Sequence, residues 1–202
     1  MIPYFLTLFL LFLGWVAIKR YQAAKKEKEQ REAFWKKEEE ANATRRQDIS
    51  SLAYIKIPTD TLPFGAGTAP EIAAQESILT SLSQKQILNL TGISNTDLKL
   101  TYGAANLPLL TEYDENFTAM CQALHQWGSL LYEDNLLEEA RKVLEFAVGS
   151  GSDVSGSYLT LAHIYQALGK EHLISDLISQ AERLNSLSKN TIILKLSEFV
   201  HN

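Results

Sequence analysis

The chain has 202 residues, of which 46% are hydrophobic and 21% charged, and its formal net charge is −5. This composition excludes a wholly disordered chain, and a single cysteine excludes an intrachain disulfide scaffold or a cysteine-based metal cluster. The length suits one ordinary domain with an extension. The charge is unevenly spread. Residues 19–46 carry ten basic and six acidic side chains, net +4, whereas residues 47–202 carry nine and eighteen, net −9.

Residues 1–18 carry no charged side chain and predict a transmembrane anchor. The apolar stretch runs from Ile2 to Ile18, the short end of what spans a bilayer as a helix. Trp15 lies near its end, where aromatic rings meet the headgroups. A signal peptide is one alternative, but it needs basic residues before the apolar stretch and a small-residue cleavage site after it. The other alternative is a buried helix of a soluble protein.

Five basic side chains follow the anchor within ten residues: Lys19, Arg20, Lys25, Lys26 and Lys28. Positive flanks stay in the cytoplasm. We therefore expect a single-pass protein of the plasma (inner) membrane, with its N-terminus outside and its C-terminal domain cytoplasmic. The same cations are expected to contact anionic lipid headgroups. Residues 19–47 lack Pro and Gly and are rich in helix formers, which predicts a basic helical stalk.

Residues 48–70 are predicted to be an extended linker laid against the domain, because a short β-prone stretch at 52–57 is followed by several Pro and Gly residues. Helix is expected over 71–90. A turn at 92–97 then leads into a short helix at 97–102, capped by Asn95 or Thr96. A long helix is expected from Pro108 to about Glu133.

The segment 120–186 matches itself when it is shifted by 34 residues. Leu124 falls on Tyr158, Trp127 on Leu161, Gly128 on Ala162, Leu131 on Tyr165, Leu144 on Ile178 and Ala147 on Ala181. Each unit is predicted to be a helix, a tight turn and a second helix, with Asn135 and Gly169 equivalent in the two turns. Small residues let the helices of a unit approach closely, and large ones fill the space between units.

This pattern resembles the tetratricopeptide repeat (TPR), a 34-residue helix–turn–helix unit. Ile174 departs from the family's Ala, and Ser152 and Ser186 depart from its terminal Pro. The resemblance implies an all-α fold, in which the anchor and stalk precede a TPR-like helical-hairpin (α-solenoid) domain over 71–202. Its units cover about 120–153 and 154–187, and a capping helix covers 190–200. The repeat core would comprise Leu124, Trp127, Gly128, Leu131, Ala140, Leu144, Ala147, Tyr158, Leu161, Ala162, Tyr165, Ile178 and Ala181.

The first helices of TPR units usually line a concave groove that binds peptides. By resemblance, the lining residues here would be Gln122, His125, Ser129, Tyr132, Leu159, His163 and Gln166. These positions hold no Lys or Arg, so the cationic clamp with which some TPR domains hold C-terminal carboxylates is not expected. The acidic domain favours a neutral or basic protein partner over nucleic acid.

We predict no catalytic residue, cofactor, metal or small-molecule substrate, because no nucleotide, hydrolase or zinc motif occurs. Cys121 and His125 lie four residues apart and would share one helical face, but we interpret them as a small core cysteine beside a surface or groove histidine. The leading hypothesis is a membrane-anchored adaptor that binds a protein or peptide segment. The alternative is a structural or assembly subunit of a membrane complex, which self-associates. A cysteine-dependent enzyme is the remote third.

Overall fold

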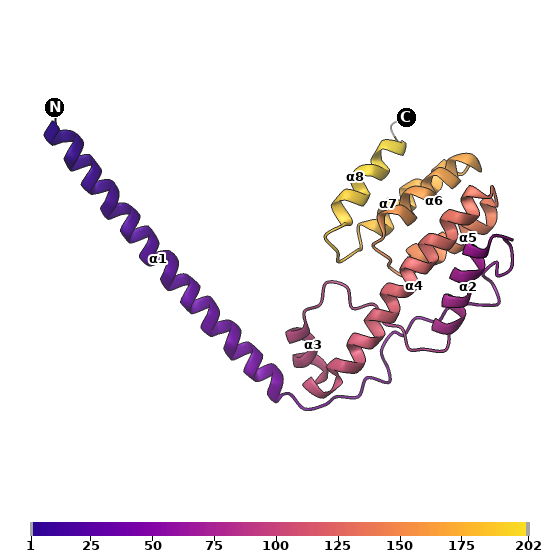
Figure 1. Ribbon diagram of the computed structural model, residues 1–202, viewed down its shortest axis with the longest axis horizontal. Coiled ribbons are helices and arrows are strands. Elements are labelled where there is room, and N and C mark those ends of the chain that lie inside the picture. The colour runs from indigo at the N-terminus through magenta and orange to yellow at the C-terminus, as the bar shows by residue number, and fades with distance from the viewer. Residues whose placement is uncertain (1, 201–202) are drawn as a thin grey trace. The chain divides into compact units, whose positions relative to one another are not determined.

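The structure, a computed structural model, describes residues 2–200, and every element of regular secondary structure within that range is a helix. The prediction of an all-α chain is therefore confirmed (Figure 1). The chain divides into two compact units. The first comprises Met1–Gln47 with Ser94–Leu107, and the second comprises Asp48–Ile93 with Pro108–Asn202.

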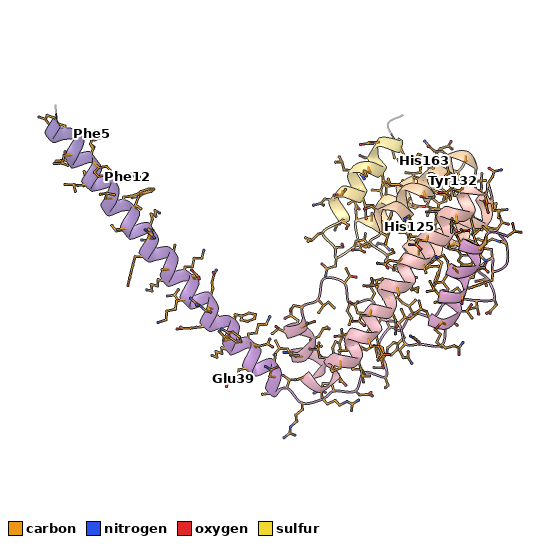
Figure 2. The ribbon with its side chains drawn as sticks, viewed as in Figure 1. Phe5, Phe12, Glu39, His125, Tyr132 and His163 are labelled. Carbon is orange, nitrogen blue, oxygen red and sulfur yellow. The ribbon has the colours of Figure 1, made fainter. Side chains whose placement is uncertain are left out.

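Helix α1 (Ile2–Ala43) joins the predicted anchor and stalk without a break. The apolar side chains of its N-terminal part project outward (Figure 2), and Phe5 is 75% exposed. Trp15 and Ile18 are exposed as well, while the side chain of Ile2 lies outside the described residues. The helix is long and apolar enough to cross a membrane, and none of its most apolar stretch is buried against other parts of the protein. A core helix of a soluble protein would be buried, whereas a signal sequence shares this length and composition.

The stalk helix ends at Ala43, four residues before the predicted boundary. After Ala43 the chain leaves the helix, and polar groups of Arg46 and Gln47 bond to the segment 102–106. The Gln47 amide donates to the Tyr102 carbonyl at 2.9 Å, and Arg46 Nε donates to Asn106 Oδ1 at 2.9 Å. Side chains four residues apart pair along the stalk, where Arg31 lies 3.8 Å from Glu27 and Lys28 lies 3.8 Å from Glu32.

A short helix, α3 (Asn95–Tyr102), packs with η1 (Ala104–Asn106) on the C-terminal end of α1. Lys37 Nζ lies 2.7 Å from Asp97 Oδ1, and Glu38 pairs with Lys99. Ala41, one helical turn further along α1, is completely buried. The capping residue is Ser94 rather than Asn95 or Thr96, because the Ser94 hydroxyl accepts from the Asp97 amide.

We expect Lys99→Glu to release α3 from α1, since it sets a carboxylate against Glu38. Faster hydrogen exchange of the amides from Lys37 to Ala43 would report the release. The double variant Glu38→Lys/Lys99→Glu should restore protection because it restores the pair with opposite polarity. Equal exchange in all three proteins would mean that the ion pair does not hold α3 in place.

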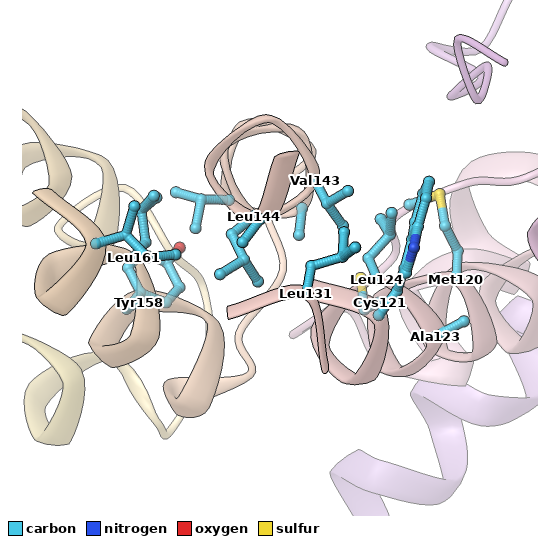
Figure 3. Packing of buried hydrophobic residues seen from close by; sticks show 14 of the residues in the cluster. Met120, Cys121, Ala123, Leu124, Leu131, Val143, Leu144, Tyr158 and Leu161 are labelled. Carbon is cyan, nitrogen blue, oxygen red and sulfur yellow. The ribbon is translucent and has the colours of Figure 1, made fainter. Parts of the chain in front are cut away.

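The second unit is built from six α-helices. They are α2 (Pro70–Leu82), α4 (Leu107–Glu133), α5 (Leu137–Gly149), α6 (Ser155–Ala167), α7 (Ile174–Ala181, preceded by η2 at Glu171–Leu173) and α8 (Lys189–Val200). Figure 3 shows α4, α5 and α6 meeting through Leu131, Leu144 and Leu161. Every residue predicted to form the repeat core is buried except Ile178, which is half-buried.

The turns α4–α5 and α6–α7 have the same backbone structure, 34 residues apart. Asn135 and Gly169 adopt left-handed φ values of 60° and 65°. A side-chain amide tolerates this conformation better than most side chains, and glycine adopts it freely. The same pairs of hydrogen bonds, typical of Schellman caps, close both helices: Leu136 N to Leu131 O and Asn135 N to Tyr132 O in one, and Lys170 N to Tyr165 O and Gly169 N to Gln166 O in the other. The predicted period is therefore present in the backbone of the turns.

Residues 48–70 pack onto the domain but form no strand over 52–57. Ile57 and Leu62 are buried, and the Phe64 ring lies 4.9 Å from the Trp127 ring, centroid to centroid. The Gly65 amide donates to Glu76 Oε1 at 2.7 Å. The linker therefore covers the face of α4 that carries Trp127.

Helix α2 ends at Leu82, eight residues before the predicted end. The apolar residues beyond it are buried without being helical, because their backbone groups bond to other parts of the domain. The Leu88 amide donates to the Tyr113 carbonyl at 3.1 Å, and the Leu90 amide donates to Asp114 Oδ1 at 3.0 Å. Helix α7 ends at Ala181, and α8 begins at Lys189, one residue before the helix predicted over 190–200.

Candidate functional site

The predicted groove residues lie on α4 and α6, on the first helix of each repeat unit. Gln122, His163 and Gln166 are exposed, while His125, Ser129, Tyr132 and Leu159 are half-buried. Figure 2 shows His125, Tyr132 and His163 on the helical domain. Tyr132 and Leu159 also pack against the hydrophobic core, so their role is partly structural.

Four of these seven residues line two small, separate pockets. His125 and Ser129 line one of about 340 Å³, together with Glu71 and Gln75 of α2. A second pocket, of about 230 Å³, is lined by His163, Gln166, Glu198 and Phe199, with the last two contributed by α8. Gln122, Tyr132 and Leu159 line neither pocket. Helices α2 and α8 thus contribute walls that the repeat pattern did not predict.

The side chain of His125, on α4, packs against the first turn of α6. A Cβ atom added at Gly156 would lie 2.3 Å from the His125 ring, so only glycine allows this approach. The Nδ1 atom of His125 is buried and has no hydrogen-bond partner among the described residues. Burial disfavours the charged imidazolium and lowers the pKa of His125 below its ordinary value of 6.5.

Folding stability is expected to fall as the pH drops through 6.5, because the unfolded chain then binds a proton at His125 that the folded chain does not. Above pH 6.5 both states are neutral at this site and the effect vanishes. Urea unfolding at pH 7.5 and pH 5.5 measures the change. His125→Gln should reduce the pH dependence, whereas His163→Gln, at an exposed histidine, should keep it. The same slope in wild type and His125→Gln would contradict the assignment.

Cys121 does not have the environment of a nucleophile. It is 3% exposed, and burial raises the pKa of its thiol to about 12. A thiolate is the reactive form, so a raised pKa opposes nucleophilic chemistry. Cys121 lies in the core with Met120 and Leu124 (Figure 3).

We expect alkylation of Cys121 at pH 8 to be at least a hundredfold slower in the folded protein than in urea. Both burial of the thiol and its raised pKa limit the reaction in the folded state. Mass spectrometry after iodoacetamide treatment measures both rates. Alkylation of the folded protein at the rate of a free thiol would revive the enzyme hypothesis.

A pocket of about 730 Å³ is lined by none of the predicted groove residues. It is bordered by the loop after α2, the end of α5, and α7 with the turn that follows it. Its lining residues are Asn89, Thr91, Val148, Gly149, Gly151, Asp176, Ser179, Gln180, Arg183, Leu184 and Asn185. This pocket could not be predicted from the sequence, because the bonds of Asn89 to Gly151 and of Asn185 to Thr91 join segments far apart in the chain.

The cations that follow the apolar segment differ in how far they are paired. Lys25 lies 3.9 Å from Glu29, and Lys28 lies 3.8 Å from Glu32. Lys19, Arg20 and Lys26 form no ion pair with a described residue. We therefore expect these three side chains to contribute most to the predicted lipid contact. The glutamates paired with Lys25 and Lys28 offset part of the positive charge of those two lysines.

Within residues 2–200, no group of three His, Cys, Asp or Glu side chains is arranged to hold a metal ion. Comparisons with protein families, with curated proteins and with solved structures find no match to this chain.

Proposed function

We propose that the protein is a membrane-anchored adaptor whose TPR-like domain binds a protein or peptide segment at the cytoplasmic face. The observation that carries the proposal is the combination of an unburied apolar helix with two helical hairpins that close through equivalent turns at 34-residue spacing. The free cations Lys19, Arg20 and Lys26 support cytoplasmic placement, because they follow the apolar segment directly.

The domain's chemistry supports a protein partner. The residues from 47 to the end carry a net charge of −9, which favours a neutral or basic segment over nucleic acid. Exposed polar side chains on the first helices, such as Gln122, His163 and Gln166, are available to a partner. A buried thiol of raised pKa gives no support to catalysis by Cys121.

Topology is tested with Lys195→Cys in a Cys121→Ser background, probed with a membrane-impermeant thiol reagent. Lys195 lies exposed on α8. Labelling only after permeabilisation is expected for a cytoplasmic domain. Labelling of intact cells would invert the proposed orientation and move the search for partners outside the membrane.

Partner binding is tested by placing a photo-crosslinking residue at Gln122 or Gln166 of the full chain in its own membrane. A discrete crosslinked protein band is expected at these positions and not at Lys142, an exposed control position on α5. Equal crosslinking at all three positions would oppose a groove. A crosslink only to a second copy of this chain would favour the assembly role, which a strict monomer in mild detergent would exclude.

A further inference from the structure

The walls of the 730 Å³ pocket are held in place by side-chain amides. Asn89 donates to the Gly151 carbonyl at 3.3 Å and accepts from the Thr91 amide at 3.0 Å. Asn185 donates to the Thr91 carbonyl across 94 residues of sequence. Gly92, at φ 80°, lies so close to Asn185 that an added Cβ would approach it to 2.4 Å. The pocket is therefore preformed, which lowers the entropy lost when a ligand binds.

Two side chains in this lining carry opposite charges. Asp176 and Arg183 are exposed, and neither forms an ion pair or a side-chain hydrogen bond with a described residue. Asp176 lies in the first turn of α7, and Arg183 lies in the turn that follows the helix.

The remaining polar lining suits a polypeptide backbone. Gln180, Asn185 and Thr91 offer groups that both donate and accept, as successive peptide units require. A lone anion or cation is a poorer fit, because either would face a like charge at Asp176 or Arg183. The volume lies within the range of about 300–1,000 Å³ that is usual for ligand sites.

We propose that this pocket binds an extended peptide segment of a partner protein, with an acidic side chain on Arg183 and a basic side chain on Asp176. This inference rests on the proposed adaptor function and assigns it to a surface made by the second helices of the repeat units.

The test uses the full chain in detergent micelles, panned against phage-displayed random dodecapeptides. Recovered peptides are expected to carry both an acidic and a basic residue. A synthetic peptide of that sequence should bind Arg183→Glu at least tenfold more weakly than wild type. Changing its acidic residue to Lys should restore binding to the variant, which now presents two carboxylates. Lys142→Glu, the same charge change at an exposed site outside the pocket, should leave binding within twofold.

Three outcomes would overturn the inference. In the first, the peptides bind Arg183→Glu as well as wild type but bind His163→Ala or Gln166→Ala more weakly. This result would exclude the 730 Å³ pocket as the binding site and leave the proposed adaptor function in place. A free dipeptide of the same two residues that competes as well as the full peptide would identify a small-molecule site instead. No enrichment over empty micelles would remove both this site and the proposed peptide binding.

Discussion

Trp127→Ala is expected to lower the free energy of unfolding of the domain by about 3–5 kcal/mol. Trp127 is completely buried in α4, and the Phe64 ring of the linker packs on it at 4.9 Å. Truncation removes a large apolar side chain and leaves a cavity that helices on both sides cannot close, because each also packs elsewhere. Urea unfolding followed by circular dichroism at 222 nm measures the loss.

Two further tryptophan variants sharpen this test. Trp127→Phe retains most of the ring volume and removes an indole N–H that is buried without a partner among the described residues, so its cost should stay below about 1.5 kcal/mol. Trp35→Ala, at a tryptophan that is 62% exposed on α1, should change stability by less than about 0.5 kcal/mol. Similar unfolding midpoints for Trp127→Ala and Trp35→Ala would show that α4 does not turn this face inward.

Gly128→Leu should destabilise the domain by about 1–3 kcal/mol or more. Even a Cβ at Gly128 would lie 2.5 Å from Cγ of Leu144, and Leu144 is fully buried and has no room to retreat. The close approach of α4 to the Leu144 side chain therefore depends on the absence of a side chain at position 128. Thermal unfolding of the purified protein measures the effect.

A double-mutant cycle separates this clash from the general effect of replacing glycine. Gly128→Leu/Leu144→Ala should be more stable than the sum of the two single changes, by about 0.5–3 kcal/mol, because the truncated residue makes room for the added one. Gly149→Ala, at a glycine with open space around it, should cost little. Strict additivity in the cycle would mean that these two positions do not meet.

The helical content of the repeat region could be predicted because its signals are local. Gly169 and Asn135 fall where the chain must adopt a left-handed φ, and the apolar spacing around Leu124 and Tyr158 identifies the buried helix faces. The TPR assignment and the position of a peptide groove remain proposals. The structure distributes the predicted groove residues between two small pockets, because α2 and α8 contribute side chains beside them.

The loop after α2 shows why other features could not be predicted. Ile87, Leu88 and Leu90 continue an apolar pattern that suggests helix, yet their backbone groups bond to Ile55, Tyr113 and Asp114. Apolar spacing reports that a residue is buried, not whether its amide bonds four residues back or to a distant segment. The docking of α3 on α1 is similar, since its ion pairs join residues about sixty positions apart.

The sequence by itself determined the long apolar helix, the charge that follows it, and the two turns at 34-residue spacing. Each of these depends on side chains within a few residues of one another, through dihedral preference and solvation. Only the tertiary structure decided that Phe64 covers Trp127, that Gly156 admits the His125 ring, and that distant loops enclose the pocket containing Asp176 and Arg183. Those features depend on contacts between segments far apart in the chain, whose pairing no local pattern encodes.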